Sequence, residues 1–463
     1  LASLSAESVM TVNSPQSSEV TYAMVDSEKN NADRYRRETI RVRQSSTYKI
    51  AQHLENAYRR PWRIPFIPFT LPLLAVNLAR ERKTQTDSIE SSQIQFSPSR
   101  GTRRSIVMFP TNGVGFGHFT RLFAIARKIK KKDPDLEIIF FTTMPTLWPL
   151  ESAGFPTYHI PGRYRYPNME PKEWNAIAEE KLSMVLNIHK PSAFIFDGSY
   201  PYRGMLNAIS NNNEMLKLWV RRGAIRPGSK STPEGSFDYF DAVIKPGDSV
   251  PIVMDEESES GIPVITCNPI TLFDSEEILP RGELRSRLGV PEEALVAYVQ
   301  LGAGRINNIN SELRHTINAL GKYEQVYTIF GESIIGERYS FPEPRLRTLR
   351  DYPNSIYFND FDFAIMAGGY NSFHESVQTG LPTILFPNMN TGRDDQLARV
   401  KVGEEAGCMV VIESRSKRSI SAAIDRIIDP EVRDLMRSNS EILRRDNGAE
   451  KISDWILEKL PKS

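Results

Sequence analysis

The sequence of 463 residues is poor in cysteine and net charge, and in long apolar runs. Its two cysteines, Cys267 and Cys408, lie in no Cys-x-x-Cys or Cys/His cluster, which excludes a disulfide scaffold, argues against a structural zinc site and fits a reducing compartment. The uncharged run at residues 64–79 has 16 residues, short of the ~20 that a membrane-spanning helix needs. The 58 Lys and Arg nearly balance the 57 Asp and Glu, so neither a basic nucleic-acid-binding protein nor a disordered acidic chain is expected.

The net charge of +1 is an average over unlike segments. Residues 1–30 contain one Lys and four acidic residues and are rich in Ser and Asn, so we expect them to be disordered. Residues 31–104 hold 15 Lys and Arg against 6 Asp and Glu, a charge of +9, which leaves −5 for residues 105–463. The chain opens on Leu1 with no signal-peptide pattern, and we take it to be a fragment or a trimmed chain.

The basic segment at residues 31–102 is expected to form an arm and a linker. A helical pattern covers residues 47–58, and we expect the prolines at 65, 68 and 72 to break regular structure in the apolar run that follows. Basic residues flank this run: Arg59, Arg60, Arg63, Arg80, Arg82 and Lys83. Aromatic and apolar side chains beside basic ones suit an anionic membrane surface, so residues 31–83 are a candidate for membrane contact. A partner protein or the protein's own surface are the alternatives.

After residue 104, short apolar runs alternate with helical patterns. The strand-like runs are residues 105–110, 137–141, 157–160, 193–196, 217–220, 241–244, 263–266, 294–300, 325–330, 363–366, 382–386 and 409–412. This alternation predicts an α/β fold with parallel, doubly wound sheets. We expect two Rossmann-like domains at residues 103–267 and 289–445 that face an interdomain cleft. A linker at residues 268–288 and a C-terminal helix within residues 446–463 complete the expected organisation.

A glycine-rich loop follows the first strand and reads Asn112-Gly-Val-Gly-Phe-Gly-His118. Gly113, Gly115 and Gly117 permit close approach of a ligand or a phosphate to the main chain. His118 would lie at a helix N-terminus, which keeps an imidazole neutral, as a general base requires. A purely structural histidine at that position is the alternative.

Two other strand ends carry polar or glycine residues. The run at residues 193–196 leads into Asp197, which is either a second candidate for the base or an Asx turn before Pro201. The run at residues 294–300 leads into Leu301-Gly-Ala-Gly-Arg305, in which Gly302, Gly304 and Arg305 could hold a diphosphate or form an ordinary turn.

The most informative motif is Ala367-Gly-Gly-Tyr-Asn-Ser-Phe-His-Glu375. Its strand ends in Gly368 and Gly369, and we expect Asn371 or Ser372 to cap a helix whose free N–H groups face a phosphate. Glu375 is one turn further on and could accept hydrogen bonds from ribose hydroxyls. Downstream lie Asp394, Asp395 and Gln396.

These motifs, in this order, resemble the nucleotide-sugar and acceptor sites of GT-B glycosyltransferases of the MurG-like family (glycosyltransferase family 28). In the resemblance, Gly369, Ser372 and Glu375 match the segment that binds the UDP diphosphate and ribose. Asp394 and Gln396 match the segment that reaches the sugar, whereas Gly115, Gly117 and His118 match the loop that faces the acceptor. The likeness covers about residues 103–460 and leaves out the first hundred residues. Tyr370 and Asn371 replace smaller residues, and Arg221 and Arg222 have no counterpart that we can place.

The resemblance implies a hexosyltransferase of bacterial surface-polysaccharide assembly. It would transfer a hexose or N-acetylhexosamine from a UDP-sugar, with inversion and without a metal, to a lipid-linked or polysaccharide acceptor. Nucleic acid is not an expected partner. We expect a cytoplasmic protein, or a peripheral one on the inner face of the membrane. A non-catalytic GT-B recruiting subunit and a UDP-sugar 2-epimerase are the alternatives.

Overall fold

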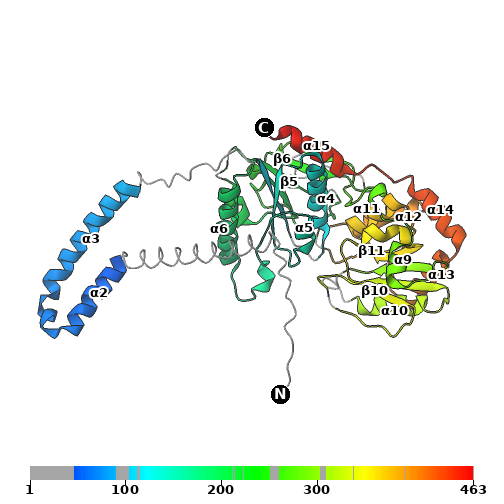
Figure 1. Ribbon diagram of the computed structural model, residues 1–463, viewed down its shortest axis with the longest axis horizontal. Helices are drawn as coiled ribbons and strands as arrows, with labels where there is room; N and C mark the ends of the chain where they lie inside the picture. The colour runs from blue at the N-terminus through cyan, green and yellow to red at the C-terminus, as the bar shows by residue number, and fades with distance from the viewer. Residues whose placement is uncertain are drawn as a thin grey trace, which may run out of the picture. The chain divides into compact units, whose positions relative to one another are not determined.

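The computed structural model describes residues 46–89, 104–111, 115–210, 212, 214–222, 224–250, 260–302, 309–336, 338–391 and 393–461. The chain divides into two compact units, Leu1–Gly101 and Thr102–Ser463, and each is described by itself (Figure 1). The disorder predicted for residues 1–30 lies outside the described residues. So do three of the site candidates, Gly113, Gly304 and Arg305.

The described part of the first unit is a helical hairpin, which we call the arm. It consists of α2 (Ser46–Arg59), the 3₁₀ helix η1 (Pro61–Phe66) and α3 (Ile67–Ile89). The helix predicted over residues 47–58 is confirmed, but the prediction that prolines break the next run is wrong. Pro61 and Pro68 lie in the first turns of η1 and α3, where a main-chain N–H has no partner within the helix. Pro72 lies inside α3, and the helix continues past it.

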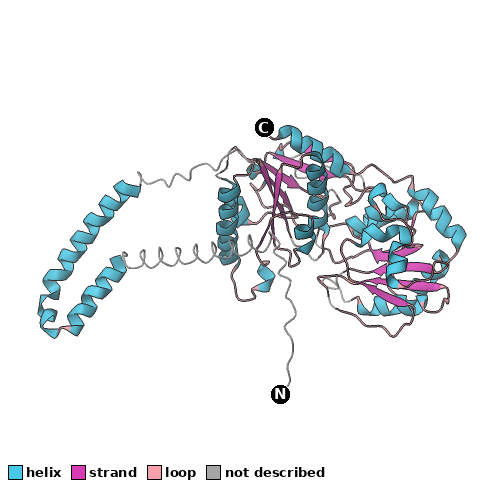
Figure 2. Ribbon diagram, in the orientation of Figure 1, coloured by secondary structure: helices cyan, strands magenta, loops and turns pink. Residues whose placement is uncertain are grey.

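The second unit contains two parallel sheets, drawn in magenta in Figure 2. The first has seven strands in the order β3-β2-β1-β4-β5-β6-β7. Its strands are β1 (Ser105–Pro110), β2 (Glu137–Thr142), β3 (Thr157–His159), β4 (Ala193–Asp197), β5 (Leu216–Val220), β6 (Ala242–Pro246) and β7 (Val264–Cys267). The helices between them are α4 (Gly117–Lys132), α5 (Trp148–Ser152), η2 (Arg163–Arg165), α6 (Pro171–His189), α7 (Arg203–Ser210) and η3 (Phe237–Tyr239). Strands β1 and β4 are buried at every residue because helices cover both faces of the sheet.

The second sheet has six parallel strands in the order β10-β9-β8-β11-β12-β13. Its strands are β8 (Leu295–Gln300), β9 (Val326–Gly331), β10 (Leu346–Leu349), β11 (Phe363–Ala367), β12 (Thr383–Phe386) and β13 (Met409–Val411). The helices are η4 (Ser275–Glu277), α9 (Glu283–Leu288), α10 (Asn310–Leu320), η5 (Asn354–Asp360), α11 (Tyr370–Thr379), α12 (Gln396–Glu405), α13 (Lys417–Ile427), α14 (Pro430–Ser440) and α15 (Gly448–Lys459). The two parallel, doubly wound sheets predicted from the sequence are confirmed. The edge strand β10 was not predicted, because its charged and polar residues interrupt the apolar pattern.

In both sheets the chain order reverses at the centre, between β1 and β4 and between β8 and β11. At such a reversal the loops after the two neighbouring strands diverge and open a crevice for ligands. Strand β1 leads to the glycine-rich loop, and its Pro110 pairs in register with Asp197 at the end of β4. Strand β8 ends at Gln300, which pairs with Met366 near the end of β11. The described parts of the candidate motifs at residues 115–118, 197, 302 and 367–375 therefore follow the strands at these two reversals.

The last helix, α15, returns to the first sheet and packs on α4, as Figure 1 shows. Ala449, Ile452 and Ile456 are fully buried in one apolar cluster with side chains of α4. At the start of α15, a Cβ on Gly448 would lie 2.0 Å from the carbonyl oxygen of Asn268, so only glycine allows this close approach. The end of the chain is thus part of the core around the first sheet.

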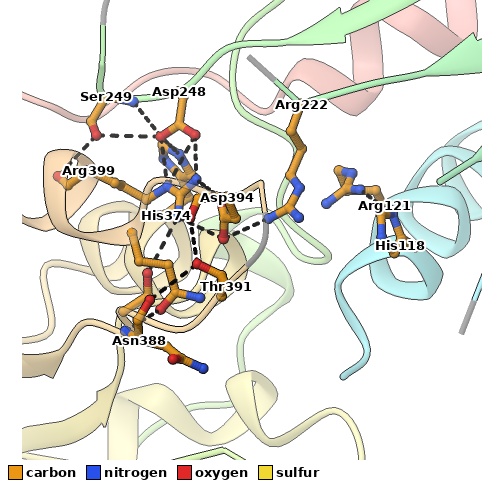
Figure 3. A network of polar contacts seen from close by, with 12 residues as sticks. His118, Arg121, Arg222, Asp248, Ser249, His374, Asn388, Thr391, Asp394 and Arg399 are labelled. Carbon is orange, nitrogen blue, oxygen red and sulfur yellow. Dashed lines mark hydrogen bonds and ion pairs between the residues drawn. The ribbon is translucent and has the colours of Figure 1, made fainter. Parts of the chain in front are cut away.

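A buried ion-pair network joins the two sheet halves of the second unit (Figure 3). Arg399 on α12 donates from Nε to Asp248 Oδ1 over 2.9 Å and from Nη2 to Asp248 Oδ2 over 2.8 Å. Asp248 follows β6 of the first sheet, and both side chains are almost completely buried. His374 on α11 adds a contact of 3.3 Å from Nε2 to Asp248 Oδ1. Burial would raise the pKa of Asp248, but Arg399 and His374 outweigh it and hold the pKa far below its ordinary value.

We expect Asp248→Asn to lower the free energy of unfolding at neutral pH by about 3 kcal/mol, because it removes one of the two carboxylates that compensate the buried guanidinium of Arg399 and leaves only Asp394. The folded-state pKa of Asp248 lies below the unfolded-state pKa near 3.8. The contribution of the pair is therefore complete above about pH 5 and is lost progressively as the pH falls below that. Urea unfolding of the wild type and the variant across this pH range measures both effects.

Asp434→Asn is the matched control, because it breaks an ion pair with Arg437 whose side chains are 77% and 48% exposed. We expect it to change stability by no more than about 0.5 kcal/mol. Equal losses in the two variants would contradict a special role for the buried pair.

Candidate active site

A cavity of about 650 Å³ is lined by residues of both sheet halves of the second unit. Gly115, Gly117 and His118 contribute from the first half. Gly302, Gly369 and Glu375 are among the residues that contribute from the second. Its volume falls in the range of small-molecule sites in proteins.

His118 and Asp197, the two candidates for a catalytic base, form one hydrogen-bonded pair. His118 Nδ1 lies 2.6 Å from Asp197 Oδ1. Arg121, one turn further along α4, donates to the same carboxylate from Nε over 2.9 Å and from Nη2 over 2.6 Å. The short contact to a carboxylate requires a proton on Nδ1, so Nε2 is the ring nitrogen that can act as a base. The structure thus unites residues that the sequence offered as alternatives.

Burial and neighbouring charges set the protonation states of His118 and Asp197. Burial lowers the pKa of His118 below 6.5, Asp197 opposes that shift, and Arg121 and Arg222 add to it. Burial would raise the pKa of Asp197, but Arg121 and His118 hold it below 3.8. At pH 7 the imidazole is therefore neutral and the carboxylate is ionised. Only His118 lines the large cavity, whereas Asp197 is fully buried behind it.

The Arg221-Arg222 pair after β5 divides between two environments. Arg221 is buried, with its guanidinium 4.7 Å from the centroid of the Trp219 ring. Arg222 lines the cavity, and its Nη1 lies 3.1 Å from Asp394 Oδ2. In Figure 3, Arg222 lies between Asp394 and the pair of α4 residues His118 and Arg121. Arg222 therefore places a positive charge in the cavity that the sequence motifs did not assign.

Asp394 is held by arginines from both sheet halves. Besides Arg222, Arg399 donates from Nη2 to Asp394 Oδ1 over 2.6 Å. Burial would raise the pKa of Asp394, but the two arginines outweigh it and lower the pKa to about 2. Asp394 lines the cavity as an ionised, charge-paired group.

Helix α11 begins at the cavity wall. Its N-cap residue is Gly369 and no side chain caps it, so the prediction that Asn371 or Ser372 is the cap is wrong. The helix begins at Tyr370, which places Asn371 and Ser372 in its first turn. The first main-chain N–H groups of a helix have no partner within it and attract anions. Asn371 Oδ1 is a buried acceptor that has no hydrogen-bond partner among the described residues.

Glu375 lies one turn into α11 and also lines the cavity. Burial raises its pKa to about 8, although hydrogen bonds from the Ser355 side chain and the Leu272 main chain work in the opposite direction. A ligand with hydroxyl donors would favour the ionised carboxylate, because the carboxylate can only accept hydrogen bonds.

The remaining candidates fall in two groups. Those that line the cavity with His118 are Gly115, Gly117, Gly302, Gly369, Asn371, Ser372, Glu375, Asp394 and Gln396. Gly368 and Asp395 lie outside the lining. A Cβ on Gly368 would lie 2.9 Å from the Val400 side chain, so this glycine serves packing. Asp395 caps α12 by accepting a hydrogen bond from Ala398 N over 3.0 Å, and the expectation that it also binds the nucleotide sugar stays a prediction.

Tyr370 is a site residue whose role sequence reasoning missed. Its ring lies near two guanidinium groups, with Arg121 at 5.4 Å and Arg399 at 5.6 Å from the ring centroid. Its hydroxyl donates to Gly247 O over 2.9 Å and accepts from Ile270 N over 3.0 Å. Arginine is attracted to the face of an aromatic ring. A tyrosine in place of the smaller residue of the resembled motif was the available signal.

Among the residues that the structure describes, no group of three or more His, Cys, Asp or Glu side chains is arranged to hold a metal ion. The acidic residues that line the cavity are instead hydrogen-bonded or paired with arginine, as Asp394 is with Arg222 and Arg399.

The comparisons with known proteins agree with the motifs, although no family model matches the sequence. The UDP-N-acetylglucosamine–N-acetylmuramyl-(pentapeptide) pyrophosphoryl-undecaprenol N-acetylglucosamine transferase of Acetivibrio thermocellus is 24% identical over 336 residues, covering 65% of this chain and 83% of the relative. The crystal structure of Acinetobacter baumannii MurG matches with a TM-score of 0.51 and 14% identity, covering 77% of this chain and 99% of that one. The glycotransferase of kitacinnamycin matches with a TM-score of 0.55 and 14% identity, covering 78% and 100%.

The two solved structures establish the fold, and the sequence match to the Acetivibrio transferase agrees with it. The predicted GT-B architecture, two Rossmann-like sheets with a ligand cavity lined from both, is confirmed. The chain is a MurG-like, GT-B glycosyltransferase-like protein.

Proposed function

We propose that this protein transfers a hexose or an N-acetylhexosamine from a UDP-sugar to an acceptor hydroxyl, with inversion, in cell-envelope glycan synthesis. The observation that carries the proposal is that a neutral imidazole, oriented by a buried carboxylate, and the N-terminus of α11 line the same cavity. The name of the Acetivibrio relative, which includes a UDP-sugar and a lipid-linked acceptor, supports a UDP donor and a lipid-linked or polysaccharide acceptor.

In the proposed reaction, His118 Nε2 removes the proton of the acceptor hydroxyl as its oxygen attacks the anomeric carbon. The bond between that carbon and the diphosphate oxygen breaks, and UDP leaves with the electron pair. Asp197 stabilises the imidazolium that forms, and Arg121 holds Asp197 in place. The N–H groups at the start of α11 would stabilise the charge that develops on the departing diphosphate.

The direct test measures UDP release by the full chain. Mass spectrometry of nucleotide sugars retained by the purified protein identifies the donor. We then expect UDP release from that donor only when lipid-linked or polysaccharide acceptors from bacterial cell envelopes are added. Binding of the donor without turnover in every acceptor fraction would contradict the transferase proposal.

Replacing His118 with Ala should lower kcat/KM by about 10²- to 10⁴-fold, the usual contribution of a general base. In the wild type, kcat/KM should fall with decreasing pH at a pKa below 6.5, because only neutral His118 accepts the proton. Asp197→Asn should cause a smaller loss, roughly 10- to 100-fold, and move this acid limb to lower pH, since Asp197 raises the His118 pKa. The pH profiles of kcat/KM for the three proteins check each effect.

His189→Gln is the control for this series. His189 ends α6, hydrogen-bonds to the Tyr158 hydroxyl over 2.9 Å and does not line the cavity, so this variant should keep the rate and the profile. An unchanged rate in the His118→Ala variant would exclude His118 as the base.

Binding of UDP should release a proton at neutral pH and tighten as the pH rises toward 8, by at most about tenfold per pH unit. Glu375 is mostly protonated in the free protein, because burial raises its pKa to about 8, and ribose hydroxyls would bind its ionised form. Calorimetry in buffers with different ionisation enthalpies counts the proton. Glu375→Gln should remove this proton release and weaken binding.

Asp351→Asn is the comparison for Glu375. Asp351 also lines the cavity, but it is paired with Arg287 and is 26% exposed. The Asp351→Asn variant should therefore keep the proton release. If Glu375→Gln releases the same number of protons as the wild type, Glu375 does not bind the ribose in its ionised form.

A further inference from the structure

The arm carries an apolar surface that its own fold leaves uncovered. Six side chains form this surface, which we call the apolar stripe: Tyr58, Trp62, Phe66, Phe69, Leu73 and Val76. Each is more than half exposed, from 52% for Val76 to 82% for Tyr58. Apolar surface of this kind marks an interaction site in soluble proteins.

Packing within the hairpin uses a different face of α3. The less exposed residues of α3 recur at helical spacing and are Ile67, Leu71, Leu74 and Leu78. Near this face, His53 Nε2 of α2 lies 2.9 Å from Thr70 Oγ1. Phe69, Leu73 and Val76 follow the same spacing two residues further on, so they lie on another side of the helix. The contacts between α2 and α3 therefore do not account for the stripe.

Basic residues border the apolar stripe. Arg59, Arg60 and Arg63 are exposed at the bend between α2 and α3. The Arg63 guanidinium carbon lies 5.0 Å from the centroid of the Trp62 ring. In the sequence, residues 59–83 contain six Arg and Lys and one acidic residue, Glu81. A partner that covers this surface is therefore apolar and anionic at once.

The apolar part of α3 is too short to cross a membrane, which favours a position on the membrane surface over a span. The stretch Pro61–Ala79 has a mean hydropathy of 1.3 and 6% of it is buried, so composition and overall length alone would also suit a span, contrary to the expectation from the uncharged run. Its first six residues form η1 at the bend. The part within α3, residues 67–79, is about 20 Å long at 1.5 Å per residue, whereas the hydrocarbon core measures ~30 Å.

We propose that the arm binds the surface of an anionic lipid bilayer. The apolar stripe enters the boundary between headgroups and acyl chains, and the basic residues contact lipid phosphates. This proposal does not depend on the transferase proposal, because none of the stripe residues lines the cavity.

The test is vesicle flotation of the full chain. Vesicles of three parts phosphatidylcholine to one part phosphatidylglycerol should bind the protein at least about tenfold more tightly than phosphatidylcholine alone, and added salt should reverse this difference. The fluorescence of Trp62 should shift to shorter wavelength on binding. A Trp62→Phe variant, which keeps the other four tryptophans, should lack that shift.

Two variants separate the apolar and the charged contributions. Phe69→Ser with Leu73→Ser should lower vesicle binding by about tenfold or more, because it removes two of the six apolar side chains of the stripe and leaves the packed face of α3 intact. Arg60→Gln with Arg63→Gln should weaken binding to the anionic vesicles and leave the weak binding to phosphatidylcholine unchanged.

Met184→Ser with Ile188→Ser is the matched control on α6 of the second unit, where these side chains are 48% and 59% exposed. It should bind vesicles like the wild type, and the circular dichroism spectrum and thermal unfolding of all variants verify that they are folded. Four results would overturn the proposal: equal losses in the stripe and control variants, equal binding to neutral and anionic vesicles, a bound arm that only detergent removes, or no vesicle binding at all. Removal by detergent alone would indicate a span, and absence of vesicle binding would favour a protein partner.

Discussion

The arrangement of the second unit depends on one buried cation, the guanidinium of Arg399. It lies on a helix beside the second sheet, yet Asp248, which compensates its charge, follows a strand of the first. A buried charge is strongly unfavourable without such a partner, so the two halves must meet where these groups meet. The same guanidinium binds Asp394 on the cavity wall. The relative position of the halves and the polarity of the cavity therefore have a common cause.

Tyr370 connects Arg399 to the end of the cavity that His118 lines. The guanidinium groups of Arg399 and of Arg121, which holds the carboxylate beside His118, lie 5.6 and 5.4 Å from the centre of the Tyr370 ring. His118 and Asp197 belong to the first sheet half, whereas Tyr370 begins α11, the helix that is expected to bind the diphosphate. Arg121 therefore contacts both Asp197, which pairs with His118, and Tyr370 of the other sheet half.

How far the sequence could predict this structure depends on the range of the interactions involved. Buried parallel strands such as β1 and β4 are recognisable from local apolar runs, and the glycine-rich loops follow from them. The pairing of His118 with Asp197 joins residues 79 positions apart. It would follow from a correct strand order, which local patterns do not give. The N-cap of α11 was misassigned because the glycine pair allows the helix to begin one residue before Asn371. The arm was misjudged in part because a proline such as Pro68 is tolerated in the first turn of a helix, whereas Pro65 and Pro72 lie inside helical segments that continue past them.

The departures from the resembled motifs identify where this protein differs from its relatives. Arg222 had no counterpart and Tyr370 replaces a smaller residue, and both line the cavity, where Arg222 contacts Asp394. Arg222 neutralises Asp394, so the aspartate expected to meet the sugar already has an arginine on each side. If a UDP-sugar binds as proposed, its sugar would meet a paired carboxylate and an added cation, where the resemblance alone leads one to expect a carboxylate. We therefore expect donor choice to depend on Arg222 and Asp394, because Gly369, Ser372 and Glu375 match the segment of the resembled motif that binds the diphosphate and ribose.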